Sequence, residues 1–448
     1  MYPKISPTSP GFESSTHRCR TILVLGASGF IGVPLLVRLK QEGYFVTGVV
    51  RDPNAVARLP LDRCIRLDLR TATSPENWFD ALSGVDAVIN CAGVLQDGAR
   101  DSTSAVHVTA PAALYEACER LGIFRVIHFS ALNADQDAVS EFSESKGQIE
   151  RILGASKLDW VILRPSVVVG RNAYGGSALF RGLASLPISL RLPQAGRVSL
   201  VQLDDVTETV IRLLRPNSGG HIAIDLAGPR PLAFDEIVAR YRAWLGWQPA
   251  RLLPVSSMAM RVGSKLGDLA GYMGWRPPMR STGMKEMSRG AEGEPAAWNR
   301  VTAIAPRSLE RTLAADPASV QERWFARLYF LRPLAIVVFA LFWVMTGVIS
   351  LTIGWDIGLS YMQESGAAQL SEPSVLAGAL ADIAVGLAIL YRPTTRLGLI
   401  GAVTITLFYL VAGTIVLPRL WADPLGPMIK IWPILCLNFM LLAILEER

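Results

Sequence analysis

The sequence predicts two architectures in one chain: a doubly wound parallel α/β sheet with a smaller second lobe, followed by an all-α bundle of four transmembrane helices. Apolar, β-branched runs alternate with helical patterns from Thr21 to Leu163, as a parallel sheet requires. A glycine-rich loop directly follows the first of these runs. The charges are divided unevenly, because residues 333–448 contain 5 Lys and Arg and 7 Asp and Glu, whereas residues 1–332 contain 39 and 31.

The composition bounds the class of protein. The chain has 448 residues, of which only 18% are charged. Soluble domains usually carry about 25% charged residues, so part of this chain is expected in lipid. The high apolar content and the lack of a short repeat exclude collagen, coiled coil and global disorder. Five scattered cysteines without a Cys-x-x-Cys pair, and four separate histidines, indicate neither a disulfide framework nor a metal site.

These features divide the chain into five segments. We expect a disordered tail over 1–19, an α/β domain over 20–215, a smaller substrate lobe over 216–300, a linker with an interfacial helix over 301–332, and a four-span membrane domain over 333–448. The first twenty residues lack the apolar run of a signal peptide, which predicts that the α/β domain stays in the cytosol.

Four apolar runs predict the membrane spans, since a bilayer core of ~30 Å needs ~20 helical residues. The runs are Leu334–Ile353, Pro373–Tyr391, Leu397–Leu417 and Met428–Leu445. Arg392 and Arg396 lie in the loop between the second and third runs, whereas the loop over 355–372 contains acidic residues and no Lys or Arg. The positive-inside rule therefore predicts a multi-pass protein of the cytoplasmic (inner) membrane with both termini in the cytoplasm.

The linker predicts a helix that begins at Asp316-Pro317, an N-cap followed by a first-turn proline. One face of this helix would carry four apolar side chains: Val320, Trp324, Leu328 and Leu331. This pattern is typical of a helix that lies on the membrane surface. An amphipathic connector packed on the bundle is an equally supported alternative.

Asp382 lies at the centre of the second apolar run, where a carboxylate usually faces the bundle interior. One interpretation is a proton relay or a polar contact to a quinone or lipid headgroup. The other is a carboxyl group that hydrogen bonds between helices, to Thr346, Thr404 or Asn438. We favour the second, because no other intramembrane acid or histidine accompanies Asp382. Glycines four residues before and after it would allow a neighbouring helix to approach closely.

The α/β domain predicts six strands and a nucleotide-binding loop. The strands are Thr21–Leu25, Phe45–Val50, Cys64–Leu67, Ala87–Asn90, Phe124–Phe129 and Trp160–Leu163, and a helix runs from about Ile31 to Glu42. Gly26, Gly29 and Gly32 follow the first strand, where glycines permit a tight turn and close backbone approach to a pyrophosphate. The helix N-terminus adds free N–H groups. The predicted contacts are Gly26, Ser28, Gly29, Phe30, Ile31 and Gly32.

The ends of the next strands predict the remaining cofactor contacts. Arg51 lies at the tip of the second strand, where an arginine suits the 2′-phosphate of NADP and an acid suits NAD. NADP is therefore expected, and Asp52 keeps NAD as the alternative. Asp68, followed by Leu69, ends the third strand and could accept from an adenine amino group. Three small residues after the fourth strand would leave room for adenosine: Cys91, Ala92 and Gly93. Ordinary turn chemistry is the alternative for these strand ends.

Together these motifs resemble the short-chain dehydrogenase/reductase superfamily, and in particular its extended and atypical branches. Those branches include proteins similar to NmrA-like regulators and to the dinucleotide-binding accessory subunit of respiratory complex I. The resemblance covers roughly residues 20–275 and includes Arg164-Pro165 and the segment 203–206. It implies an NAD(P)-binding Rossmann fold. The charge-poor tail resembles the DoxX-like four-helix membrane family.

The resemblance also implies a reaction centre made of a serine and a Tyr-x-x-x-Lys motif. Ser130 closes the fifth predicted strand, and Lys146 matches the lysine, which would bind the nicotinamide ribose. Phe142 stands where the family has its tyrosine, and a phenyl ring has no proton to give. Tyr174 is a candidate substitute in a later strand-end loop. We expect His107 and His128 to be structural.

Two functions follow from these features. The first is an NAD(P)H-dependent oxidoreductase or epimerase-like enzyme that acts on a lipophilic substrate such as a quinone or isoprenoid. The second is a non-catalytic NAD(P)H-binding sensor or assembly factor with a membrane-complex partner of unknown identity. We expect no metal, because the cysteines and histidines form no ligand pattern. We also expect no nucleic acid, because anionic lipid explains the positive charge beside the membrane.

Overall fold

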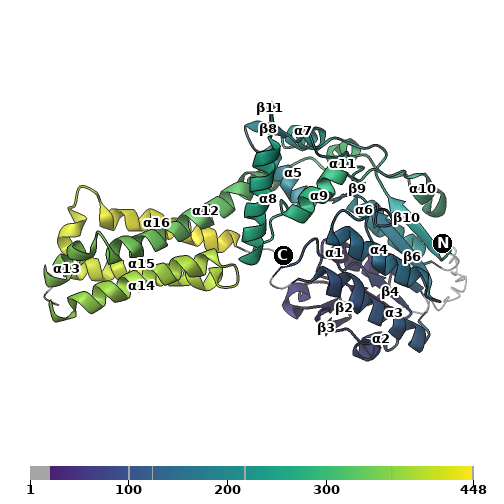
Figure 1. The fold of residues 1–448 in the computed structure, drawn as a ribbon, viewed down its shortest axis with the longest axis horizontal. Coiled ribbons are helices and arrows are strands. Elements are labelled where there is room, and N and C mark those ends of the chain that lie inside the picture. The colour runs from purple at the N-terminus through teal and green to yellow at the C-terminus, as the bar shows by residue number, and fades with distance from the viewer. Residues whose placement is uncertain are drawn as a thin grey trace, which may run out of the picture.

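The computed structural model describes residues 21–98, 101–123, 125–215, 218–364, 366 and 368–445. Figure 1 shows an elongated molecule in which a two-lobed α/β part lies at one end of a bundle of long helices. This is the predicted combination of a parallel sheet, a smaller lobe and a helical bundle. The tail expected over 1–19 lies outside the described residues.

The larger lobe contains a seven-stranded sheet in which all neighbouring strands are parallel. The strands are β1 (Thr21–Leu25), β2 (Phe45–Val50), β3 (Arg63–Arg66), β4 (Ala87–Asn90), β5 (Arg125–Phe129), β6 (Asp159–Pro165) and β10 (Ile222–Leu226). Their order is β10-β6-β5-β4-β1-β2-β3, which reverses direction beside β1. Such a reversal opens a crevice at the carboxyl ends of the strands, where α/β sheets bind ligands.

The first, second and fourth predicted strands have the predicted bounds. β3 ends at Arg66 instead of Leu67, because Arg66 forms the last pair of its ladder with β2. β6 continues to Pro165, because Leu226 at the end of β10 pairs with it. Phe124, the predicted start of the fifth strand, lies outside the described residues.

Helices cover both faces of the sheet. α1 (Gly32–Gln41) and α6 (Leu203–Leu213) pack on one face, and α2 (Phe79–Leu82), α3 (Ala110–Leu121) and α4 (Glu141–Gly154) pack on the other. α1 begins one residue later than predicted and stops before Gly43, whose φ of 82° is the left-handed conformation that commonly ends a helix.

The smaller lobe surrounds a second apolar core. Its helices are α5 (Gly175–Ala184), α7 (Phe234–Trp244), α8 (Ser257–Tyr272), α9 (Ser281–Arg289) and α11 (Leu309–Ala315). Two short parallel pairs complete it, β7 (Val168–Val169) with β9 (Val201–Gln202), and β8 (Ile188–Arg191) with β11 (Arg251–Pro254). Phe180 of α5 packs its ring against Phe234 and Tyr241 of α7, with centroids 5.4 and 6.2 Å apart.

The chain returns to the larger lobe in α10 (Ala296–Thr302). Trp298 is fully buried in the core between the sheet, α1 and α6. Its Nε1 donates to Thr209 Oγ1 over 2.8 Å. The end of the segment 216–300 therefore packs on the larger lobe.

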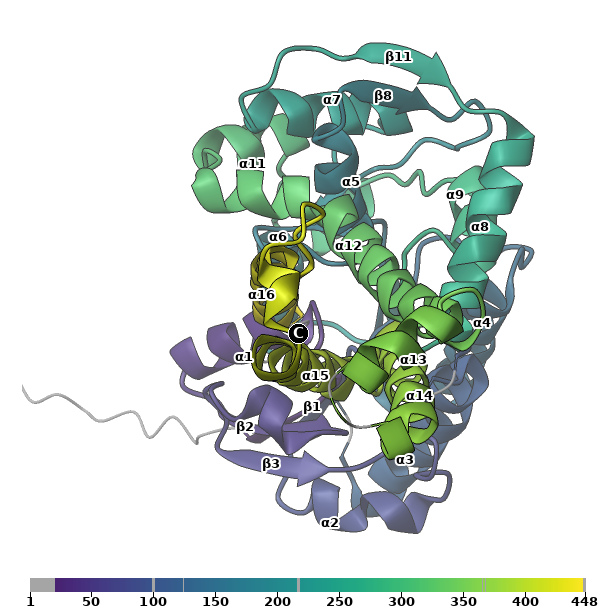
Figure 2. The same ribbon diagram turned by 90° about the vertical axis from the view of Figure 1, so that its left-hand side faces the viewer.

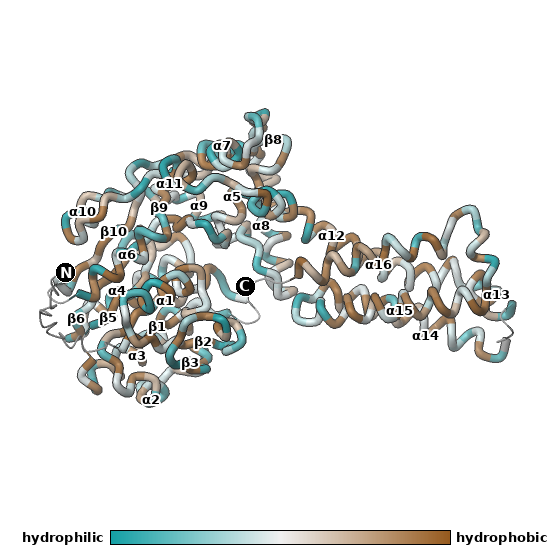
Figure 3. The backbone as a smooth tube through the Cα atoms, turned by 180° about the vertical axis from the view of Figure 1, so that it is seen from behind, coloured by the Kyte–Doolittle hydropathy of each residue, from teal (hydrophilic) through white to brown (hydrophobic). Residues whose placement is uncertain are grey.

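Among the residues that the structure describes, four helices are long and apolar enough to cross a membrane, as the four apolar runs predicted. They are α12 (Val320–Leu351), α14 (Ser371–Leu390), α15 (Thr395–Val416) and α16 (Pro427–Ile444). The short helix α13 (Trp355–Glu364) follows α12 at the end of the bundle away from the α/β part. Figure 3 shows that hydrophobic residues dominate the bundle.

The linker helix differs from its prediction. α12 begins after Ser319, whose side chain accepts from Gln321 N while Glu322 bonds back to Ser319. This capping box replaces the predicted cap at Asp316. The helix then runs without a break past Pro333 into the first span. The predicted surface helix and the first span are therefore one continuous helix.

Asp382 bonds between helices, but to a partner that the sequence did not suggest. Tyr409 of α15 donates its hydroxyl to Asp382 Oδ1 over 3.1 Å. The predicted partners were wrong, because the hydroxyls of Thr346 and Thr404 donate to carbonyls of their own helices and the amide of Asn438 donates to Leu399 O. Small residues do allow close packing here, since a Cβ added at Gly386 would lie 2.7 Å from a carbonyl of α12.

Trp298 provides a test of the packing in the larger lobe. Trp298→Ala should lower the free energy of unfolding by about 3–5 kcal/mol, because it empties a fully buried site. Trp324→Ala is the matched control, since Trp324 is 62% exposed and should cost little. Thermal unfolding of the full chain in detergent measures both, and equal losses would contradict the assignment.

Candidate functional site

The glycine-rich loop brings β1, β4 and α1 close together at the carboxyl edge of the sheet. Gly26 has a φ of 71°, and a Cβ added there would lie 2.8 Å from the backbone of Ala92. A Cβ at Gly32 would lie 2.2 Å from Gly26 O. Neither position accepts a side chain, so the loop turns tightly and points the first turn of α1 at the edge. The amide hydrogens of that turn lack acceptors within the helix and suit a pyrophosphate.

The end of β4 closes the loop from the other side. Cys91 Sγ donates to Leu25 O over 2.8 Å, and Ala92 N donates to Asn90 Oδ1 over 3.1 Å. Burial raises the pKa of the Cys91 thiol to about 12, so this thiol stays protonated. A Cβ added at Gly93 would lie 3.7 Å from Lys146 Nζ, which places this turn against the expected reaction centre.

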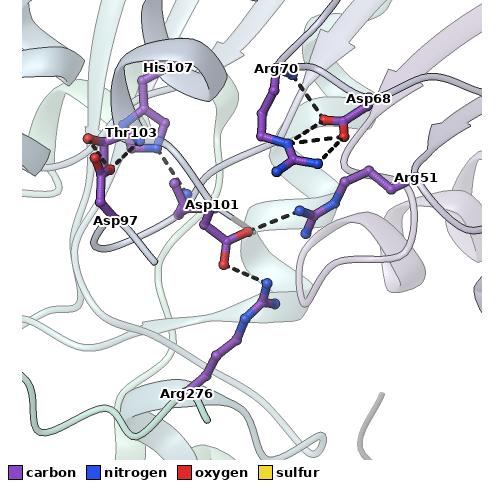
Figure 4. A network of polar contacts seen from close by, with 9 residues as sticks. Arg51, Asp68, Arg70, Asp97, Asp101, Thr103, His107 and Arg276 are labelled. Atoms are coloured by element: carbon purple, nitrogen blue, oxygen red, sulfur yellow. Dashed lines mark hydrogen bonds and ion pairs between the residues drawn. The ribbon is translucent and has the colours of Figure 1, made fainter. Parts of the chain in front are cut away.

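Charged side chains form a network where the sequence predicts that the adenosine part of the cofactor binds (Figure 4). Arg51 Nη1 donates to Asp101 Oδ1 over 3.1 Å, and Arg276 Nη2 donates to the other oxygen of Asp101 over 2.5 Å. Arg70 donates to both oxygens of Asp68 and lowers the pKa of that carboxyl. Asp68, the expected adenine acceptor, is therefore held by Arg70, while Leu69 packs on the core beneath the edge.

Ser130 and Lys146, the residues of the implied reaction centre, meet at the carboxyl end of β5. Lys146 Nζ donates to Phe129 O over 2.8 Å, directly before Ser130. Both side chains are buried. Burial lowers the pKa of Lys146 to about 8. Ser130 Oγ has no hydrogen-bond partner within the described part of the chain, which leaves it free for a ligand.

Arg164, from the Arg-Pro motif, positions the helix that carries Lys146. Its Nη2 lies 2.5 Å from Glu150 Oε2, and its Nε donates to both oxygens of the same carboxylate. Glu150 is buried one turn after Lys146 in α4. Because a buried ion pair needs close geometry, this contact fixes α4 against the end of β6.

Phe142 stands where the short-chain dehydrogenase motif has its tyrosine, and its ring makes an aromatic contact. Its ring meets the imidazole of His107 edge-on, with centroids 5.6 Å apart. His107 Nε2 accepts from Val94 N over 3.0 Å, and Nδ1 bonds to Ser145 Oγ over 2.8 Å. Burial lowers the pKa of His107 well below its usual range. His107 is therefore neutral and fully bonded, as predicted.

His128 is also buried and neutral, but only one of its ring nitrogens is paired. Tyr115 OH donates to His128 Nδ1 over 2.7 Å, and Asn90 Nδ2 donates to Tyr115 OH. His128 Nε2 has no partner among the residues that the structure describes. Burial lowers the pKa of His128 well below its usual range, so the group carries no charge.

Tyr174 lies at the glycine-rich loop. It precedes α5, and its ring stacks on Phe30 with centroids 5.7 Å apart. A cleft of about 450 Å³ opens beside it, lined by Arg171 and Arg181 on one side and by Phe325 of α12 on the other. The cleft therefore lies between the loop that carries Tyr174 and the helix that continues as the first membrane span.

Several residues of the site were not predicted. Arg70 stands two positions after Asp68, a local signal that could have been used. Asp101 and Arg276 are 175 residues apart, and nothing in the local sequence pairs them. Among the described residues, no group of three or more His, Cys, Asp and Glu side chains could hold a metal ion.

Two segments of the chain match known families. Residues 26–182 match the NAD(P)H-binding family, and residues 340–439 match the DoxX-like family. The amino-terminal part is an NAD(P)-binding Rossmann domain with relatives among short-chain reductases and epimerases. The carboxyl-terminal part is a DoxX-like membrane domain.

Relatives and solved structures match part of this chain. An uncharacterized protein of Mycobacterium tuberculosis is 29% identical over 219 residues, which are 49% of this chain and 23% of that protein, so the chain spans about a quarter of its length. The ceramide reductase of Caulobacter vibrioides is 25% identical over 197 residues, 43% of this chain and 61% of the reductase. UDP-glucuronic acid 4-epimerase from Bacillus cereus, solved with UDP-glucuronic acid and NAD, is 18% identical with a TM-score of 0.52 over 69% of this chain and all of the epimerase.

The unpaired hydroxyl of Ser130 gives a prediction. Ser130→Ala should change the free energy of unfolding by less than about 0.5 kcal/mol, because no hydrogen bond within the described chain is lost. Ser177→Ala should cost about 1 kcal/mol, because the buried Ser177 Oγ accepts from Tyr174 N and donates to Tyr174 O. Denaturation of the ligand-free protein measures both. A large loss for Ser130→Ala would show that the hydroxyl is structural.

Proposed function

We propose that this protein is a membrane-anchored NAD(P)H-dependent oxidoreductase or epimerase-like enzyme that acts on a lipophilic substrate, such as a quinone or isoprenoid, at the cytoplasmic face of the inner membrane. The observation that carries the proposal is the direct seating of the α/β part on the bundle. Trp275 Nε1 donates to Leu390 O over 2.9 Å, and Arg392 N donates to Met273 O over 3.0 Å. A site tethered in this way meets membrane-dissolved substrates at a raised effective concentration.

The cleft beside Tyr174 supports a substrate with a polar head and an apolar tail. Arg171, Asn172 and Arg181 supply polar groups from the α/β part, and α12 supplies the polar Gln321 and Glu322 together with the apolar Phe325. α12 leads from this cleft into the first span, so a substrate tail can follow the same helix. The name of the Caulobacter relative, a ceramide reductase, is consistent with a lipid as substrate.

The side chains of the reaction centre can replace the missing phenol. A bound NAD(P)H would supply the hydride for reduction of a substrate carbonyl. Ser130 Oγ–H is free to donate a hydrogen bond to the carbonyl oxygen. The Lys146 ammonium can transfer a proton from Nζ to that oxygen, because its pKa of about 8 lies near the operating pH. Phe142 and the buried His107 pack edge to face nearby.

Phe142 also supports a second function, a non-catalytic NAD(P)H-binding sensor or assembly factor. The phenyl ring removes the family's proton donor while the glycine-rich loop remains intact. Tight NADPH or NADH binding without oxidation by any short-chain quinone, in single-turnover experiments, would favour this function over the enzyme.

The role of Lys146 predicts the pH dependence of reduction. Single-turnover oxidation of bound NADPH should slow as the pH rises through about 8, because deprotonation removes the proton donor. Lys146→Arg keeps the charge but cannot release a proton, so the rate should fall about 10²- to 10⁴-fold and the decline with pH should disappear. An unchanged pH profile in Lys146→Arg would exclude Lys146 as the donor.

NADP is the proposed cofactor, with NAD as the alternative, because Arg51 lies at the tip of β2. Arg51→Ala should weaken NADPH binding by about 1–3 kcal/mol, roughly 5- to 150-fold, in the range of charge-assisted hydrogen bonds. Binding of NADH should change little. Asp101→Asn should tighten NADPH binding, because Asp101 competes for the Arg51 guanidinium.

Titration calorimetry measures these affinities. Arg63→Ala is the matched control, since Arg63 is exposed at the opposite end of the neighbouring strand β3 and bonds to Asp80 O. Equal losses for NADPH and NADH in Arg51→Ala would show that Arg51 does not read the 2′-phosphate.

A further inference from the structure

Helix α8 turns its large apolar side chains outward. Five of them are between 49% and 76% exposed: Met258, Val262, Leu266, Leu269 and Tyr272. Their spacing of three and four residues places them on one face of the helix. We call this face the α8 stripe. A contiguous exposed apolar surface on a folded protein usually marks a site that contacts another protein, a membrane or a ligand.

The opposite face of α8 buries Met260 near its start and then only small residues, which pack closely on the smaller lobe. Ser264, Gly267 and Gly271 are buried. A Cβ added at Gly267 would lie 2.1 Å from Met279 O, so the helix backbone lies directly on the segment before α9. A surface helix in water normally buries its large apolar residues and exposes small or polar ones. After Met260, α8 has the reverse arrangement, because the large apolar residues of the stripe are exposed and the small residues are buried.

The position of α8 identifies what the stripe meets. Figure 1 shows α8 on the side of the α/β part that is turned toward the bundle, with α9 behind it, and Figure 2 shows α8 to one side of the bundle helices. The chain leaves α8 through Met273, whose carbonyl accepts from Arg392 N in the loop after α14, and Trp275, which donates to Leu390 O at the end of α14. When the bundle spans a bilayer, α8 therefore lies along the membrane surface where α14 ends, with its stripe turned to the lipid.

Charge on the same side of α8 matches a lipid surface. Arg261 and Lys265 are exposed beside the stripe. Their long side chains can lay apolar stems along the stripe and reach lipid phosphates with the charged heads. An apolar face bordered by cationic residues is typical of helices in the membrane interface.

We propose that α8 is an interfacial helix whose stripe inserts between the lipid headgroups of the leaflet adjoining the α/β part. This surface, together with the spans, fixes the tilt of the α/β part on the membrane and the height of its reaction centre. The interfacial helix expected from the sequence over 301–332 thus has its counterpart in α8, because α12 continues straight into the bundle. The proposal depends on the membrane domain and not on the proposed enzyme activity.

Site-specific photo-crosslinking of the full chain tests this. The photoreactive residue p-benzoylphenylalanine replaces Leu266 in protein reconstituted into vesicles of phosphatidylethanolamine and phosphatidylglycerol. The same replacement at Leu121 is the matched control, since Leu121 is 47% exposed at the end of α3, a helix that Figure 1 shows away from the bundle. Leu397, 70% exposed on α15, is the positive control.

After illumination, mass spectrometry should find a lipid adduct at positions 266 and 397 and not at 121. An adduct at 397 without one at 266 would overturn the proposal. A cross-linked dimer through position 266 would overturn it as well, because a second copy would then cover the stripe. All three positions are exposed side chains, and an unchanged melting curve confirms that each replacement leaves the fold intact.

Discussion

Helix α12 is longer than a bilayer is thick, and this excess length determines where the nucleotide-binding part sits. Its 32 residues extend about 48 Å at 1.5 Å per residue, whereas a bilayer core is about 30 Å. The first turns must therefore stand outside the lipid. There they pack on α5, since a Cβ added at Gly182 would lie 2.2 Å from the ring of Tyr329. Because α12 is continuous and packs on α5, the α/β part cannot rotate freely relative to the bundle. Its site therefore stays over one part of the membrane surface.

The sequence predicted those parts of the fold that are set by local pattern. The bounds of β1, β2 and β4 follow from short β-branched runs between turn residues, and the four spans follow from hydropathy. The predictions that failed concern features that are determined by tertiary contacts. β6 extends because β10 pairs with it, and the start of α12 depends on a capping box at Ser319 instead of the aspartate three residues earlier. Asp382 accepts a hydrogen bond from Tyr409, and this pairing depends on how α14 and α15 are rotated about their axes.

The candidate site shows the same division. The glycines and the Ser130 and Lys146 pair stand in motifs, and the structure places them at one edge of the sheet. The contact between Phe142 and His107 links two distant helical segments, and sequence alone gave no reason to connect them. The α8 stripe was hidden for a different reason. Its apolar spacing is that of any surface helix, and only the crowded glycines on the other face show which side is turned outward.

Asp101 connects a residue of the predicted nucleotide site with a residue beside the membrane domain. Its carboxylate is shared between Arg51, at the nucleotide edge, and Arg276, the residue next to the tryptophan that bonds the bundle. One negative charge thus balances two positive ones in a site where the Asp101 side chain is only 11% exposed. A ligand that draws Arg51 away leaves Arg276 with a stronger hold on the carboxylate. The pairing of Arg276, beside the contact with the end of α14, therefore depends on the position of Arg51 at the predicted nucleotide site.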